Sequence, residues 1–540
     1  MAQHLSRRAR STFLAASALT LAAPAPGAPQ TGTFDISALR TRAEASDFME
    51  TSSYADVVAF VRALDRASDR VHLTTMGYTS EGRPIPMLVV GDLPDASAEA
   101  VRASGKLRVY IQGNIHAGEV PGKEALQMFV RGILSGEYPD WSDEVVLLIV
   151  PIYNADGNER MALDNRPRQH GPIGGMGQRP NAQGLDLNRD HMKLDSPEAR
   201  SLVRMMSEYD PHLSVDLHTT NGTRHAYHVT YAPPLHPGTP EGITGLLRGR
   251  MLPALTETIR AKRGIDFYYY GNSGGFGRGG AGAVPEWRTF DHRPRFNNNY
   301  AGLRNRLAIL SEAYAYLTFE DRVLSTLWFV EEIVAYSHDH AAELARVVEA
   351  ADAPVVGHTL PTRATMARSD DMVTILMGEV DEERHPFTGA VILRRRDVRR
   401  PVRMWEYGTF EATDSEVVPA RYLIPPELDD IAERLRAHGV AMTALASATS
   451  MDVEEFALDS VTTAPREFQG HAEQTLYGRW RATSREVPEG TLVVEASQPL
   501  GRLVFYLLEP RSDDGFADWG LLARALEGSG TYPILRVPPG

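Results

Sequence analysis

Cysteine is absent from this chain of 540 residues. Its absence excludes disulfide bonds, thiolate metal ligands, a cysteine nucleophile and a lipid-modified cysteine anchor. Any bound metal ion must therefore be held by histidine, aspartate and glutamate. The chain also lacks an excess of basic residues, because 56 Lys and Arg stand against 70 Asp and Glu, a net charge of −14. This balance argues against nucleic acid as a partner, since a phosphate backbone requires a basic surface. We interpret the local basic run at 393–403 as a solvated strand face or a protected sheet edge.

Long apolar runs are scarce as well, and the N-terminal one is short. The apolar run at 13–23 follows three arginines and precedes small residues and prolines. This order is typical of a secretory signal peptide, which we place at residues 1–28. The run is too short for a permanent membrane anchor. The adjacent Arg7 and Arg8 are also found in signal peptides of the twin-arginine export route. The alternative for this segment is a disordered cytosolic tail. We predict an exported protein, periplasmic or extracellular.

The length predicts more than one domain, and 43% hydrophobic with 23% charged residues is typical of a globular protein. From residue 53 to 351, short apolar runs alternate with helical spacing, which predicts an α/β domain at 33–350 with a mixed, mostly parallel sheet flanked by helices on both faces. A linker follows, and then a β-rich mixed domain at 355–540 of unknown role, with one helix at 426–438. The expected strands are 106–113, 145–154, 212–220 and 306–316, and the expected helices include 53–68, 123–134, 197–208 and 241–262.

Polar groups follow the four buried strands at the point where each strand ends. They are "GNIHAGE" (113–119), "NADG" (154–157), "DLHTTNG" (216–222) and "SEAYAY" (311–316). The carboxyl ends of parallel strands meet at one edge of a sheet, which predicts that these groups form one site. A second His-x-x-Glu pair, His340 and Glu343, falls in a charged helical stretch, where we expect exposed side chains.

A hydrolytic zinc ion takes three protein ligands and leaves a fourth position for water. The pair His116 and Glu119 supplies two of them. His218, delivered by an apolar strand to the same sheet edge, is the candidate for the third. The alternative for a histidine at a strand end is a surface or hydrogen-bonded residue. We predict one Zn²⁺ per chain.

The motifs "GNIHAGE", "NADG", "GLDLNRD" (184–190) and "DLHTT", in this order, resemble the zinc metallocarboxypeptidases of the carboxypeptidase A-like superfamily. The resemblance extends over about residues 55–335. It implies an α/β/α fold with a mixed sheet and one zinc ion bound by the three ligands above. It further implies that Asp186 holds the first ligand histidine by its other ring nitrogen. Asn188 and Arg189 match the pair that binds the terminal carboxylate of the substrate in that family. A planar guanidinium suits this role because it offers a carboxylate two parallel hydrogen bonds.

The resemblance also implies a catalytic glutamate, an arginine for the oxyanion and a tyrosine that closes over the substrate terminus. Glu312 matches the glutamate because it ends an apolar strand downstream of all the ligands, whereas its competitor Glu320 begins a charged helix. Arg166 is the expected oxyanion stabiliser, with Arg168 as a close alternative. Tyr300 is the candidate for the closing tyrosine.

Together these features predict a zinc-dependent metallocarboxypeptidase that acts on peptides. The alternatives are a zinc amidase or deacylase acting on acylated amino acids or cell-wall peptides, and a non-catalytic binding protein. Gly277, Gly279 and Gly282 have the spacing of a dinucleotide-binding loop without its strand-turn-helix context, and we expect a mobile loop bordering the substrate cleft instead. No pattern in the chain predicts its oligomeric state.

Overall fold

The structure is a computed structural model that describes residues 35–273 and 284–540. The predicted signal peptide and the glycine-rich loop at 277–282 therefore lie outside the described residues. Ile36–Gly540 forms one compact unit. Among the described helices, none has the length and apolar character needed to cross a membrane.

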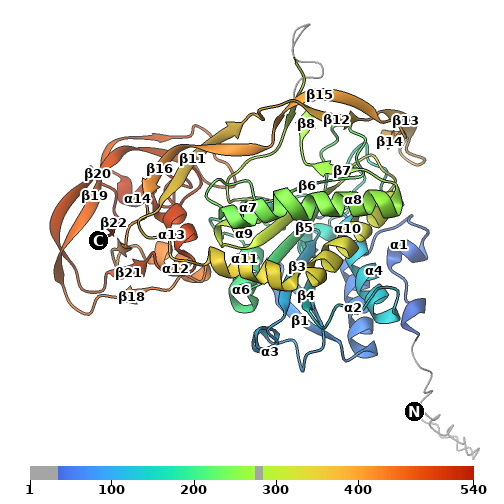
Figure 1. The fold of residues 1–540 in the computed structure, drawn as a ribbon, viewed down its shortest axis with the longest axis horizontal. Helices are drawn as coiled ribbons and strands as arrows, with labels where there is room; N and C mark the ends of the chain where they lie inside the picture. Colours follow the sequence, from blue (N-terminus) through green and yellow to red (C-terminus); the bar gives the residue numbers. More distant parts are fainter. Residues whose placement is uncertain (1–34, 274–283) are drawn as a thin grey trace, which may run out of the picture. The chain divides into compact units, whose positions relative to one another are not determined.

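A central mixed sheet organises the first part of the chain (Figure 1). Within the described residues it has eight strands in the order β1-β2-β4-β3-β5-β10-β6-β7. β4, β3, β5 and β10 are neighbours and run parallel, whereas β1 and β2 form an antiparallel edge and β6 is antiparallel to β10. The strands are β1 Val71–Tyr78, β2 Pro84–Val90, β3 Leu107–Gly113, β4 Val145–Val150, β5 Leu213–Thr219, β6 Val229–Ala232, β7 Phe267–Tyr269 and β10 Leu307–Ala313.

Helices cover both faces of this sheet because its strands bury side chains on both sides. On β3, Val109 and Ile111 join one apolar cluster and Tyr110, between them, joins the other. The first cluster packs under α2, α4, α8, α10 and α11, and the second under α3, α6 and α9. The predicted fold class, a mixed and mostly parallel sheet between helices, is confirmed. The helices are α1 Arg42–Ala45, α2 Tyr54–Ala67, α3 Ala98–Ala103, α4 Pro121–Ser135, α5 Ala155–Asn158, α6 Pro197–Tyr209, α7 Glu241–Leu246, α8 Leu252–Arg263, α9 Asn297–Leu303, α10 Phe319–Asp339 and α11 Ala341–Ala351, with short 3₁₀ turns at Ile36–Ala38 and Leu187–Arg189. A short π-helix at Leu247–Met251 joins α7 to α8, within the stretch predicted as one helix.

Helix α4 matters for the site because it begins directly after the His-x-x-Glu loop. Pro121 stands in its first turn, where the missing N–H of proline leaves no hydrogen bond unmade. The helix ends at Gly136, whose φ of 75° is the left-handed conformation that glycine adopts without a steric penalty. Glu124, fully buried in this helix, accepts hydrogen bonds from both hydroxyls of Thr51 and Ser52 and from the Ser52 N–H. These contacts fix the helix, and with it the loop that precedes it, against the start of the described chain.

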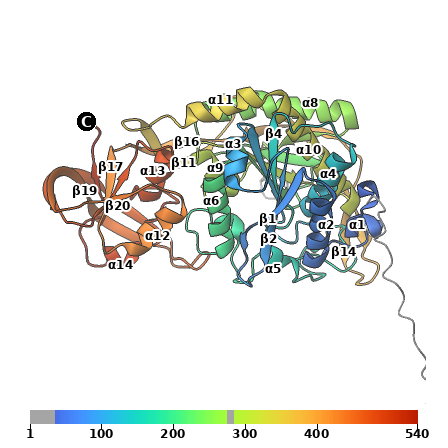
Figure 2. The same ribbon diagram turned by 90° about the horizontal axis from the view of Figure 1, so that it is seen from below.

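The region after α11 is rich in β-structure, as the sequence predicts, and the structure divides its strands among several sheets. Some of its strands pair with strands from the first part of the chain. In one sheet, β12 and β15 join β8 Asn272–Ser273 and β9 Glu286–Arg288. The second apolar cluster also continues from α6 into this region, and Figure 2 shows α12 beside α6. The two parts of the chain therefore interlock. The elements are β11 Thr359–Ala367, β12 Val373–Met377, β13 Val380–Arg384, β14 Val391–Arg395, β15 Arg400–Tyr407, β16 Thr409–Val417, β17 Arg421–Ile424, α12 Asp429–Ala437, β18 Thr443–Ala444, β19 Thr449–Thr463, β20 Gln474–Val487, β21 Leu492–Glu495, α13 Gly501–Leu508, α14 Ala523–Leu526 and β22 Leu535–Val537.

Candidate metal centre and substrate cleft

The candidate site lies at the carboxyl ends of the parallel strands. Gly113, the last residue of β3, pairs with Leu217 of β5, and His218 of β5 pairs with Glu312 of β10. The loop between β3 and α4 carries the His-x-x-Glu pair. The "NADG" segment after β4 supports that loop, because Asn154 donates from its backbone N–H to the Asn114 carbonyl at 3.2 Å. The sheet thus gathers the polar strand ends at one edge.

Three of the predicted site residues converge on one point. His116 Nδ1 lies 3.0 Å from Glu119 Oε1, and His218 Nδ1 lies 2.9 Å from Glu119 Oε2. All three side chains are buried, and one ligand atom from each lies within 4.8 Å of the other two. Two imidazole nitrogens and one carboxylate at this separation form the ligand set of a catalytic zinc site.

The outer nitrogens of both imidazoles are also occupied. His116 Nε2 lies 3.0 Å from Asp186 Oδ1, and His218 Nε2 lies 2.8 Å from Asp216 Oδ2. A carboxylate at Nε2 keeps the proton there and leaves the Nδ1 lone pair facing the site. The residues therefore fit a divalent metal ion. Asp186 stands where the sequence predicts it. Asp216 was missed, although its position two residues before His218, on the same face of β5, is a usable signal.

Two carboxylates of the site have lowered pKa values. Burial alone would raise the pKa of Glu119, but its contacts with His116 and Arg166 outweigh burial and keep that pKa well below its usual value. The same competition, with His116 and Arg179 as the opposing contacts, keeps the pKa of Asp186 well below its usual value. Glu119 also accepts the backbone N–H of Thr219 at 3.1 Å. Glu119 therefore offers an anionic oxygen, which a dication prefers as a ligand.

Glu312 lies on β10 beside His218 of β5, and the pKa of its carboxyl group is shifted in the opposite direction to that of Glu119. Its Oε2 is buried and has no hydrogen-bond partner among the described residues. Burial, reinforced by the charge of Glu119, raises the pKa of Glu312 to about 8 despite the opposing charge of His218. A carboxyl group with a pKa in this range can take up and release a proton near neutral pH. The competitor Glu320 is exposed in the first turn of α10.

These residues line a cleft of about 230 Å³ together with the Asn-Arg pair. Arg189 places its guanidinium carbon 3.9 Å from the centroid of the Phe296 ring and donates to the Asn188 carbonyl at 2.6 Å. Burial lowers the pKa of Arg189, and no carboxylate of the described residues forms an ion pair with it. Within the part of the chain that the structure describes, Arg189 thus borders the cleft without an ion-pair partner. The cleft residues that sequence reasoning missed are Arg179, Thr219, Asn221, Tyr270, Phe290, Phe296 and Leu310.

Three arginines near the site are candidates for stabilising an oxyanion. Arg166 borders the cleft with Nη2 2.5 Å from Glu119 Oε1. Arg168 lines a neighbouring cavity instead, and its carbonyl accepts the backbone N–H of Leu393 at 2.8 Å. Arg179 donates from Nε to Asp186 Oδ2 at 2.9 Å and keeps a side chain that is 44% exposed. The signal for Arg179 was its place in "RPNAQGLDLNRD", in the loop that leads into the Asn-Arg motif.

The structure places Tyr300, the candidate for the closing tyrosine, away from the residues that line the cleft. Tyr300 is fully buried in α9, and its hydroxyl lies 2.7 Å from His438 Nδ1 and accepts from Arg304 Nη1 at 3.3 Å. The aromatic rings on the cleft are Tyr270, Phe290 and Phe296. Helix α9 turns Tyr300 toward the interior, which the short distance to Glu312 along the chain does not reveal.

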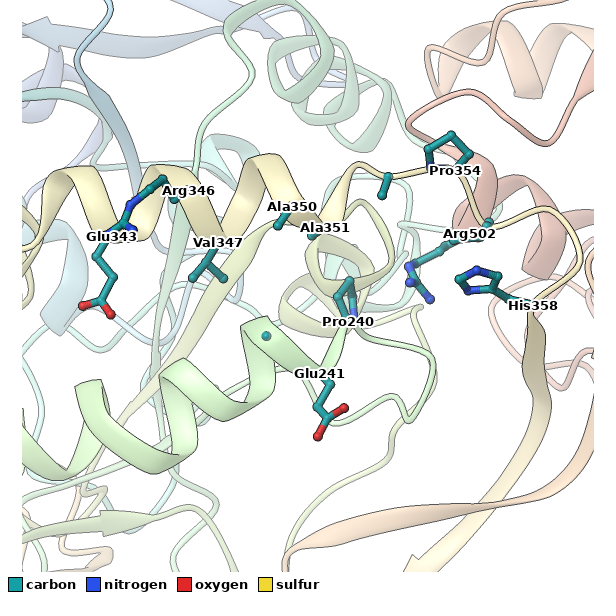
Figure 3. Close-up of a pocket in the computed structure, with 13 residues that line it drawn as sticks. Pro240, Glu241, Glu343, Arg346, Val347, Ala350, Ala351, Pro354, His358 and Arg502 are labelled. Atoms are coloured by element: carbon teal, nitrogen blue, oxygen red, sulfur yellow. The ribbon is translucent and has the colours of Figure 1, made fainter.

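Two further features lie away from the cleft. His340 and Glu343 form a loose pair, 3.7 Å apart, at the junction of α10 and α11, where the His340 side chain is 43% exposed. A larger cavity of about 430 Å³ lies between α7, α11 and the segment leading into the C-terminal region (Figure 3). Arg502 and His358 lie at one end of it, and Glu343 and Arg346 at the other (Figure 3). The residues with metal-binding and proton-transfer chemistry gather in the smaller cleft.

Comparison with known proteins finds similarity to carboxypeptidases. Residues 57–234 match the family model described as zinc carboxypeptidase. Carboxypeptidase 2 of Trichophyton rubrum is 24% identical over 509 residues, which cover 88% of this chain and 85% of that protein. Carboxypeptidase E of Caenorhabditis elegans is 33% identical over 130 residues, which cover 23% of this chain and 26% of that protein. A metallo-carboxypeptidase structure from Burkholderia cenocepacia aligns with a TM-score of 0.39 at 19% identity, over 54% of this chain and 70% of that one. The resemblance predicted from the motifs is confirmed: residues 57–234 match the zinc carboxypeptidase model, and the full-length relatives that the chain matches are carboxypeptidases.

Proposed function

We propose that this protein is a zinc-dependent metallocarboxypeptidase that removes residues from the C-termini of peptides. The observation that carries the proposal is Arg189, a cation beside the three metal ligands with no ion pair among the described residues. A partly buried charge without a partner is costly, and binding a carboxylate removes that cost. A guanidinium binds a carboxylate through two parallel hydrogen bonds. A free C-terminal carboxylate therefore matches this end of the cleft.

The metal site takes one zinc ion, held by His116, Glu119 and His218. When bound there, zinc supplies a Lewis acid that polarises the scissile carbonyl and lowers the pKa of water. Glu312 takes the proton from the attacking water and passes it to the leaving amine. Its Oε2 has no hydrogen-bond partner among the described residues, which leaves that oxygen available to the water.

The remaining polar and charged side chains of the cleft bind the substrate carboxylate and stabilise the developing oxyanion. Asn188 and Arg189 hold the terminal carboxylate and so place the last peptide bond beside the metal ligands. Arg166 borders the cleft next to Glu119 and stabilises the oxyanion, with Arg179 as a second donor on the Asp186 side. Asp186 and Asp216 keep the two imidazoles in position. The N-terminal residue pattern supports export as the setting of this activity.

A comparison of substrates tests the proposal against the deacylase alternative. We expect peptides with a free C-terminus to be cleaved with a kcat/KM roughly 100-fold above that of their C-terminally amidated forms, because only the free carboxylate pairs with Arg189. N-acyl amino acids should be poorer substrates than peptides. The measurement is the rate of release of the last residue, followed by mass spectrometry. Equal cleavage of free and amidated peptides, or a preference for acyl amino acids, would contradict the carboxypeptidase assignment.

A further inference from the structure

The C-terminal region reaches the metal centre through the loop between β19 and β20. Gln469, in this loop, accepts the backbone N–H of Asp186 at 2.8 Å, across 283 positions of sequence. The Asp186 carboxylate in turn contacts His116 Nε2 and accepts the backbone N–H of Asn188, each at 3.0 Å. One hydrogen bond therefore separates the β-rich region from the group that orients a metal ligand.

Gln469 occupies the tip of a tight hairpin turn, where Phe468 and His471 each donate a backbone N–H to the carbonyl of the other. Its φ is 53°, in the left-handed region that costs free energy for any residue with a Cβ, and Gly470 follows at 81°. A two-residue turn of this kind needs positive φ at both positions, and it fixes the direction of the Gln469 side chain. Here the side chain of Gln469 is partly buried and directed at the Asp186 main chain. The strained residue is thus the one that makes the contact.

Ion pairs hold the rest of the loop on the same surface. His471 Nε2 lies 2.7 Å from Asp195 Oδ2, and Glu473 Oε1 accepts from Arg295 Nη2 at 2.8 Å. Arg295 precedes Phe296, whose ring lies beneath the Arg189 guanidinium. The loop therefore contacts both the segment that carries Asp186 and the segment that supports Arg189.

We propose that Gln469 is a positioning residue for the catalytic site, and that the β-rich region completes this site. By holding the Asp186 main chain, Gln469 fixes the carboxylate that orients His116. It also fixes the start of the Leu187–Arg189 turn, which presents Arg189 to the substrate. The inference rests on the proposed zinc site and on the proposed role of Arg189. It assigns a catalytic purpose to a region that carries no catalytic group of its own.

The test uses the full-length chain with Gln469→Gly. Glycine removes the acceptor oxygen and also relieves the left-handed strain. In the absence of zinc, the melting temperature of the variant should therefore be no lower than that of the original protein. Loss of zinc to a chelator should be about 10-fold faster, at the lower end of the effect of groups that hold a metal ligand. KM for peptides with a free C-terminus should rise several-fold, while kcat at saturating zinc stays within about threefold.

Two further variants separate positioning from general structure. Gln469→Glu keeps an acceptor oxygen and should retain zinc within about twofold of the original protein. Gln474→Ala is the matched control, because the Gln474 side chain donates to Thr463 within the same pair of strands. If Gln469→Gly left both the rate of zinc loss and KM unchanged, the role of Gln469 would be overturned, whereas the proposed zinc site would stand. Failure of the original protein to bind zinc would instead overturn the proposed function.

Discussion

Replacing Glu312 by glutamine is expected to lower kcat by roughly 10³-fold while the zinc content stays at one per chain. Glutamine preserves the size and the hydrogen-bonding oxygen of the side chain but cannot carry a proton. Folding should not suffer, because the buried Oε2 of Glu312 has no hydrogen-bond partner among the described residues that the substitution would remove. Steady-state kinetics on a peptide with a free C-terminus, with zinc measured by atomic absorption, gives both quantities.

The matched control for this change is Glu320→Gln. Glu320 is an exposed glutamate only eight positions further along, in the first turn of α10. Its substitution should leave kcat and zinc content unchanged. Activity retained in Glu312→Gln, or lost equally in both variants, would mean that the proton passes through another group.

Replacing Arg189 by methionine is expected to lower kcat/KM for peptides with a free C-terminus by about 100-fold. Methionine keeps the apolar contact with Phe296 but removes the cation that pairs with the substrate carboxylate. Cleavage of amidated peptides should stay at its low level, because those substrates never use the charge. The ratio of kcat/KM between free and amidated forms of one peptide should therefore fall toward one.

Arg204→Met provides the comparison for a lost arginine elsewhere. Arg204 lies on α6, with a side chain that is 56% exposed. This variant should keep the preference for the free C-terminus. If Arg189→Met lowered cleavage of free and amidated peptides by the same factor, Arg189 would support the site without reading the carboxylate.

The sequence revealed the central part of the fold and site because the determining signals are local. Buried parallel strands appear as short continuous apolar runs, and the polar residues that end them must share one sheet edge. That rule alone brings His116, Glu119, His218 and Glu312 together. The family motifs then added Asp186 and the Asn-Arg pair.

The remaining features depend on contacts that no local pattern encodes. Arg179 and Tyr270 reach the cleft from loops whose path is set by packing, and Tyr300 is buried because of the way α9 meets His438. The interlocking of the two regions rests on pairings such as Trp405 with Glu286, more than a hundred positions apart. The contact from Gln469 to the metal centre is of the same kind. These long-range pairings required the three-dimensional structure.

Anomalous diffraction at the zinc absorption edge, from crystals grown with zinc, tests the central claim most directly. The account predicts one strong peak per chain at about 2.1 Å from Nδ1 of His116, Nδ1 of His218 and the carboxylate of Glu119. Absence of a peak at that point, or a peak bound to other residues, would contradict it.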